Sequence, residues 1–165
     1  MIEHKQEQDQ WLDEQLLFAS SCGAKHVVIF QHIPWFFANR DENDDYFNIE
    51  TNVRKEMLSK IKSAGIKYVF AGHYHRNAGG FDDGLEMVVT SAVGQQINND
   101  KDSGMRIVCV TTDKITHEYY ELDSVPTSVT LWNKKKRQRS VSRRILITSV
   151  EKVTRPGTSH HPFTW

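Results

Sequence analysis

Two short apolar runs, each followed within two residues by a histidine, place the strongest constraint on the fold. Residues 26–31 read His-Val-Val-Ile-Phe-Gln and precede His32, while residues 68–71 read Tyr-Val-Phe-Ala and lead to His73. Continuous β-branched and aromatic runs are typical of strands buried on both faces. Residues 51–64 between them predict a helix, because their apolar positions recur every three or four residues. This order predicts a parallel βαβ unit with both histidines at one sheet edge.

The second run continues as Gly72-His73-Tyr74-His75-Arg76. In extended or tightly turned backbone, residues two apart point the same way, so the imidazoles of His73 and His75 can aim at one point. Imidazole is the commonest side-chain ligand of divalent transition metals. Together with His32, they predict a cluster of three imidazoles that holds one zinc ion or is shared between two ions. The alternative is a chance neighbourhood of two loop histidines.

Charge divides the chain into two parts. Residues 1–123 contain twelve basic and twenty acidic residues, whereas residues 124–165 contain nine basic residues and one acidic residue. We expect a folded domain in the first part and a basic, disordered or weakly ordered tail in the second. Within the tail, Ile145–Ile147 resembles a strand without a partner. The cluster Lys134–Arg144 is compatible with nucleic-acid binding, but its few aromatic residues favour a solvated tail.

The remaining patterns complete the expected domain. Residues 3–21 predict a helix because they are rich in helix formers, and Thr51 is expected to cap the second helix. Residues 35–49, rich in aromatic and acidic side chains, predict a long loop that is either solvated or faces substrate. The first helix should bury one face, formed by Trp11, Leu12, Leu16 and Ala19. Turns are expected at 77–80 and 82–84, and strands at 85–91, 105–111 and 115–121, the last two as a hairpin.

Two functional classes are disfavoured by the composition. Two cysteines, Cys22 and Cys109, give neither a disulfide framework nor a CxxC metal motif. The sequence has no leader pattern at its start and no apolar run long enough to span a bilayer. We therefore expect a cytoplasmic chain with no membrane partner.

The two histidine segments resemble the last two metal motifs of the calcineurin-like metallophosphoesterases. The matching segments are Val27–Pro34 and Val69–Arg76, and the resemblance extends over residues 6–123. It implies an α/β fold in which this chain forms the C-terminal half of a four-layer α/β/β/α sandwich. It also implies hydrolysis of phosphate monoesters by two divalent ions, Mn, Fe or Zn. The implied activity is that of a protein serine/threonine phosphatase acting on a phosphoprotein.

By the same resemblance, His32 and His73 would bind the second metal, His75 the first, and Arg76 would contact the phosphate or form a salt bridge. The family's Asp-x-His, Gly-Asp-x-x-Asp and Gly-Asn-His motifs are absent, so no catalytic residue can be assigned. We expect an incomplete metal site, an inactive isolated chain and a sheet face left bare. The alternative is a catalytically inactive truncated isoform that acts as a binding or competing module.

Overall fold

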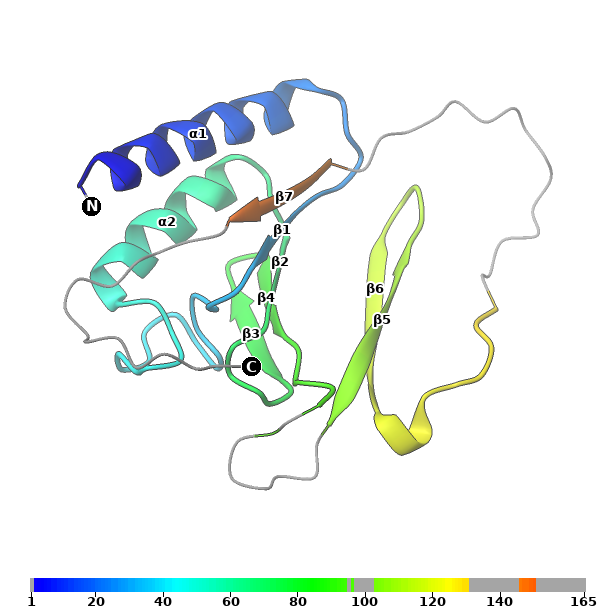
Figure 1. Ribbon diagram of the computed structural model, residues 1–165. Coiled ribbons are helices and arrows are strands. Elements are labelled where there is room, and N and C mark those ends of the chain that lie inside the picture. Colours follow the sequence, from blue (N-terminus) through cyan, green and yellow to red (C-terminus); the bar gives the residue numbers. More distant parts are fainter. Residues whose placement is uncertain (1, 95, 97–102, 131–145, 151–165) are drawn as a thin grey trace.

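The computed structural model describes residues 2–94, 96, 103–130 and 146–150 (Figure 1). The helices are α1 (Ile2–Ser21), α2 (Thr51–Ser63) and a short 3-10 helix, η2 (Leu122–Ser124). The strands are β1 (Val27–Gln31), β2 (Tyr68–Ala71), β3 (Ala78–Asp82), β4 (Leu85–Val89), β5 (Gly104–Val110), β6 (Ile115–Glu121) and β7 (Leu146–Val150). No helix in the described ranges is both long enough and apolar enough to cross a membrane.

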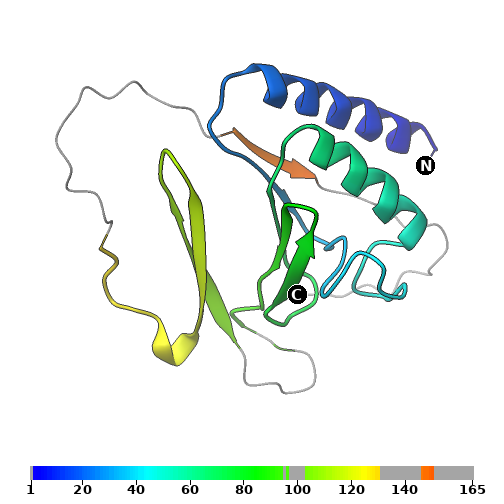
Figure 2. The same cartoon turned by 180° about the vertical axis from the view of Figure 1, so that it is seen from behind.

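Five strands form one sheet in the order β3-β4-β2-β1-β7. Strands β4, β2, β1 and β7 run parallel to one another, and β3 runs antiparallel to β4. Helices α1 and α2 lie side by side over one face, and the β5–β6 hairpin stands against the other (Figures 1 and 2). The predicted α/β class and the parallel β1–α2–β2 unit are therefore confirmed.

The period of two along each strand divides the core between the two faces. Ile29, Val69 and Met87 occupy matching positions on three neighbouring strands and pack beneath the helices. The next row, one residue further along, faces the hairpin instead and includes Phe70 and Val88. Both faces of the central strands are thus apolar, which explains why their sequences show unbroken apolar runs.

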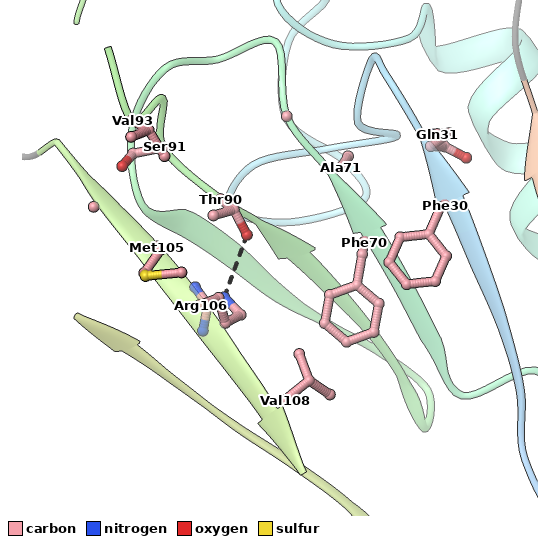
Figure 3. Close-up of a pocket in the computed structure, with 12 residues that line it drawn as sticks. Phe30, Gln31, Phe70, Ala71, Thr90, Ser91, Val93, Met105, Arg106 and Val108 are labelled. Atoms are coloured by element: carbon pink, nitrogen blue, oxygen red, sulfur yellow. Dashed lines mark hydrogen bonds between the residues drawn. The ribbon is translucent and has the colours of Figure 1, made fainter. Parts of the chain in front are cut away.

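The hairpin covers only part of the second sheet face. Phe70 is buried there, whereas the adjacent Phe30 stacks on it at 5.3 Å between ring centroids and remains 39% exposed. Between the sheet and β5 lies an open cleft of about 380 Å³. Figure 3 shows the two phenylalanines on the sheet, Met105 and Val108 on β5, and Arg106 reaching Thr90. The bare face expected from the sequence is therefore a partly covered cleft.

Strand β3 replaces the turn expected at residues 77–80. Gly79 has φ 142°, and a Cβ atom there would clash with the carbonyl oxygen of Met87 on β4. The glycines thus allow two backbones to approach closely, which is a role that composition alone does not distinguish from a turn. The turn expected at 82–84 is confirmed, because Asp83 and Gly84 connect β3 to β4 with positive φ.

Strand β7 corrects a second expectation. Its five residues pair in parallel with β1, from Leu146 opposite Val27 to Val150 opposite Gln31. The segment near Ile147 therefore does not stand alone. β1 is a central strand with backbone groups on both sides, and β7 satisfies the side that β2 leaves open. The basic cluster Lys134–Arg144 lies outside the described residues.

Helix α2 differs from expectation in two residues. Thr51 does not cap it: Glu50 occupies the cap position without a side-chain bond. Instead, Thr51 donates from its backbone N–H and its hydroxyl to Oδ1 of Asp44, at 2.7 and 2.6 Å. The second difference is Arg54, which is 0% exposed beside the apolar stripe of the helix.

Helix α1 buries most of the face that the sequence predicts. Leu12, Leu16 and Ala19 are buried as expected, but Trp11 is 37% exposed.

Candidate metal-binding edge

His32 and His73 meet at the carboxyl edge of the sheet. His32 follows β1 and His73 follows β2, and the N–H of Gly72 donates to the carbonyl of His32 at 3.2 Å. Nδ1 of His73 lies 3.1 Å from Nε2 of His32. Because parallel neighbours end at the same edge, the βαβ unit itself brings these two imidazoles together.

The backbone after β2 is strongly bent at both histidines of the Gly-His-x-His motif. His73 has φ 62° and His75 has φ 53°, which is the left-handed region that non-glycine residues rarely occupy. The N–H of Tyr74 donates to the carbonyl of Gly72 at 2.7 Å, which closes a γ-turn centred on His73. Each such conformation costs about 1–3 kcal/mol, and such strain clusters at functional sites.

This bend changes the expected arrangement of three imidazoles. In the described part of the chain, no three side chains of His, Cys, Asp or Glu converge closely enough to hold a metal ion. The structure therefore brings together His32 and His73, and His75 does not complete a triad with them. The i, i+2 rule describes extended backbone, and the left-handed φ angles at His73 and His75 depart from that conformation. A ligand role for His75 remains a prediction.

The two adjacent nitrogens suit a shared metal ion. Two imidazole nitrogens bound to one zinc ion at about 2.0–2.1 Å, with an angle between about 90° and 110°, lie about 2.9–3.4 Å apart. The 3.1 Å separation between His73 and His32 falls within this range. The residues present therefore fit two ligands of one ion.

The loop between β1 and α2 fixes the imidazole of His73 from the other side. Nε2 of His73 lies 3.4 Å from the carbonyl oxygen of Tyr46. Because a carbonyl only accepts hydrogen bonds, this contact favours the tautomer with the proton on Nε2 and an unprotonated Nδ1, which is the form that binds a metal. The rings of Tyr46 and Phe47 lie 5.4 and 5.6 Å from that of His73. Sequence reasoning did not find this contact.

Glu42 organises the first half of this loop. Its carboxylate accepts from the backbone N–H groups of Phe37, Ala38 and Asn39 at 2.8–3.1 Å. It also accepts from the side-chain amide of buried Asn48 at 2.8 Å. One carboxylate therefore ties together residues at both ends of the loop.

Arg54, on helix α2, holds both the middle and the end of the loop. Its guanidinium makes four hydrogen bonds of 2.8–3.0 Å to backbone carbonyls, two of them to Ile49 and one each to Arg40 and Glu42. Asp44 Oδ1 lies 3.6 Å from the same group. The long loop predicted for residues 35–49 is confirmed, but it is held by buried polar groups rather than by its aromatics alone. In the sequence, the position of Arg54 within the apolar stripe of the helix could have indicated this buried role.

Arg76 contacts an aromatic ring. Its Nη1 donates to the hydroxyl of Tyr74 at 3.1 Å, and its guanidinium carbon lies 5.2 Å from the centre of that ring. Tyr74 in turn stacks on Phe37 at 4.5 Å with an interplanar angle of 6°. Arg76 is half-buried and directly follows His75 in the sequence.

The comparisons with known proteins show which class of protein this chain resembles. No protein-family model matches the sequence. The chain is nevertheless similar to curated relatives of the calcineurin-like phosphoesterase family. These relatives carry the name serine/threonine-protein phosphatase CPPED1. The bovine protein is 54% identical over 121 residues, the human protein 52% over 122 residues and the zebrafish protein 50% over 115 residues.

The match is partial on both sides. It covers 73% of this chain and 38% of the bovine and human relatives. For the zebrafish relative the shares are 70% and 37%. The chain thus spans well under half the length of the proteins that it resembles, and the activity of those whole proteins is not transferred by similarity alone.

Proposed function

We propose that this chain contributes to a binuclear metal centre that hydrolyses phosphate monoesters, and that its activity class is protein serine/threonine phosphatase with a phosphoprotein substrate. The observation that carries this proposal is the 3.1 Å contact between His32 and His73 at the ends of two parallel strands. The names of the relatives support the same class. Two divalent ions in such a centre clamp the phosphate, acidify a water molecule and stabilise the leaving oxygen.

The chain's own residues would divide the work as follows. His32 and His73 would together hold one of the two ions, and His75 would be a ligand of the other. Arg76 lies near the phosphate, where its guanidinium attracts the negative charge of the substrate. The contact of Nε2 of His73 with the carbonyl of Tyr46 favours the tautomer in which Nδ1 would be the metal ligand. The ions would be Mn, Fe or Zn, since imidazole binds all three.

The second sheet face supports the finer part of the fold proposal. The cleft in Figure 3 has apolar walls, and Phe30, Val93 and Val108 are 39–60% exposed there. Such a face suits packing against another sheet. We therefore propose that residues 1–123 form part of a four-layer α/β/β/α sandwich, and that residues 124–165 form a basic segment from which β7 joins the same sheet. We also propose a cytoplasmic location for the chain.

One observation favours a second candidate function. Only two imidazoles from the described residues meet at the edge, and no third His, Cys, Asp or Glu joins them. The sequence also contains no Gly-Asp dipeptide and no Gly-Asn-His. An ion held by this chain alone would thus be under-coordinated. The second candidate is therefore a catalytically inactive module that binds phosphoproteins or competes with a complete phosphatase.

The deciding experiment is hydrolysis of p-nitrophenyl phosphate by the purified chain with manganese, beside a His75→Ala variant. Manganese-dependent activity that disappears in the variant supports the phosphatase proposal for this chain and makes His75 a ligand. Calorimetric titration with Zn²⁺, compared with His73→Ala, separates binding from turnover. Metal binding without hydrolysis supports the inactive module, and the absence of both contradicts the metal-centre proposal.

A further inference from the structure

A second concave site lies at the opposite, amino edge of the sheet. It is a pocket of about 310 Å³, which is within the range of sizes that small ligands occupy. Residues preceding β1 and β2 line it, together with the turn between β5 and β6. Because β1 and β2 are parallel, their first residues share one edge, and β1 separates this pocket from the histidine pair by about 17 Å of strand.

Two hydrogen bonds hold the hairpin turn against this edge. Nε2–H of His26 donates to the carbonyl of Thr111 at 2.8 Å. The hydroxyl of Tyr68, at the start of β2, donates to the carbonyl of Ile115 at 3.2 Å. Since both partners of each bond come from different parts of the fold, the walls of the pocket are fixed by tertiary structure.

The lining of this pocket is strongly basic. Lys25, Lys67 and Lys114 contribute to it, along with His26 and a single carboxylate, that of Asp113. The carboxylate of Asp113 already accepts a hydrogen bond from the hydroxyl of Thr112 at 3.2 Å. This concentration of positive charge occurs within residues 1–123, where acidic residues outnumber basic ones by twenty to twelve.

The three pocket lysines differ from the other lysines whose side chains the structure describes. Each of the others forms an ion pair at 2.5–3.3 Å: Lys5 with Asp9, Lys55 with Asp41, Lys60 with Asp13 and Lys62 with Asp82. Within the described residues, Lys25, Lys67 and Lys114 form no ion pair. Despite the excess of carboxylates in residues 1–123, the three described lysines without an ion pair all surround the same pocket.

We propose that this pocket binds a phosphate group, either as free inorganic phosphate or as a phosphate monoester. Ammonium groups are compact charges with three donors each, and several of them around one cavity favour a multiply charged anion. The site is separate from the histidine edge, and its binding does not depend on the function proposed above. Its role is to hold an anion rather than to cleave it.

The test is a titration of the ¹⁵N-labelled chain with inorganic phosphate in the presence of EDTA, followed by amide chemical shifts. EDTA removes any metal, so phosphate cannot be held by a metal ion at the histidine edge. We expect shifts at Lys25, Gly65 and Lys114 and none around His73. Raising NaCl from 10 to 150 mM should weaken binding, because salt screens exposed charges.

The matched variants change the net charge equally. A triple variant with Lys25→Gln, Lys67→Gln and Lys114→Gln should bind phosphate about tenfold more weakly or worse. The control with Lys5→Gln, Lys55→Gln and Lys60→Gln should stay within about twofold of the natural chain. The single variant Lys67→Gln provides the same comparison if the triple variant loses its dispersed spectrum. Equal weakening in the control, or shifts centred elsewhere, overturns the proposal.

A final comparison separates the two sources of phosphate. A short phosphoserine peptide is titrated beside the same peptide with serine. Tighter binding of the phosphopeptide than of inorganic phosphate assigns the pocket to phosphorylated residues. Equal or weaker binding of the phosphopeptide assigns it to the free anion. Binding of both serine and phosphoserine peptides with the same affinity contradicts a phosphate site.

Discussion

The two edges of the parallel sheet are built in opposite ways. At the carboxyl edge, His73 contacts a loop that Glu42 and Arg54 hold by hydrogen bonds to its backbone groups. At the amino edge, Lys25, Lys67 and Lys114 surround a pocket and form no ion pair in the described part of the chain.

The difference shows how much rigidity the side chains at each edge require. Two strained histidines need a rigid surrounding to hold them, and buried hydrogen bonds supply it at the carboxyl edge. An anion pocket needs charge rather than exact angles, so flexible lysines suffice at the amino edge. Substitutions should therefore affect stability at the first edge and ligand binding at the second.

The largest effect is expected from Arg54→Met, which leaves the carbonyls of Ile49, Arg40 and Glu42 without their donor. Buried unsatisfied groups cost about 1–3 kcal/mol each, so the free energy of unfolding should fall by about 3–5 kcal/mol in urea denaturation. The neighbouring exposed Lys55→Met should change it by less than about 0.5 kcal/mol. Similar losses in both variants would show that the buried guanidinium does not hold the loop.

Metal addition should stabilise the chain through the histidine pair. At a free Zn²⁺ concentration of about 100 times the dissociation constant, linkage raises the free energy of unfolding by about 2.7 kcal/mol. The increment should vanish in His73→Ala and on addition of EDTA, as measured by thermal unfolding. His26→Ala, which removes an imidazole from the opposite edge, should keep it. A response retained in His73→Ala would place the ion elsewhere.

A smaller, pH-dependent effect is expected at Asp82, where β3 ends. Burial by itself raises the pKa of the Asp82 carboxyl, but Lys62 at 2.9 Å and Arg40 at 3.2 Å outweigh burial and hold that pKa below its ordinary value. A carboxyl with a depressed pKa stabilises the fold above its ordinary pKa of about 4, and this contribution is lost as the pH falls through the folded value.

Asp82→Asn should therefore lower the free energy of unfolding by about 1–3 kcal/mol at pH 6, after allowance for the partly exposed Arg40. The difference between the variant and the natural chain should shrink toward pH 3. Urea denaturation at both pH values measures it. A difference that stays constant with pH would mean that the ionised carboxylate is not the stabilising group.

The smallest effect belongs to the pocket lysines. Replacing Lys25, Lys67 and Lys114 together by glutamine should change the free energy of unfolding by less than about 0.5 kcal/mol, because these side chains form no ion pairs to lose. Chemical denaturation without phosphate measures this change. A loss above about 1 kcal/mol would indicate that these lysines stabilise the fold directly.

The sequence predicts the framework of this molecule well, because periodicity reports burial directly. The apolar runs at residues 26–31 and 68–71 correctly placed β1, β2 and their shared edge, and the hairpin of β5 and β6 followed from its alternating segments. The resemblance to the phosphoesterases was confirmed through the CPPED1 relatives.

The failures arose where one residue type serves two structural purposes. Gly79 indicated a turn, but its missing Cβ admits the backbone of β4. The spacing of His73 and His75 predicted convergent imidazoles, but it did not reveal the left-handed backbone at both residues, and a ligand role for His75 stays a prediction. The role of Arg54 depends on carbonyls up to fourteen positions away, and the strand near Ile147 depends on a partner in β1. Neither distant partner leaves a local pattern.

The position of β7 in the sequence also determines when the sheet can be completed during translation. β1 is complete at residue 31, whereas its outer neighbour ends at residue 150. At about 5–20 residues per second, translation takes on the order of ten seconds to cover that interval. Throughout this time one side of an apolar strand can template pairing with another nascent chain. Slow codons between these segments would therefore lengthen the stage in which the chain can aggregate. Co-translational chaperones would bind the exposed side of β1 during that stage.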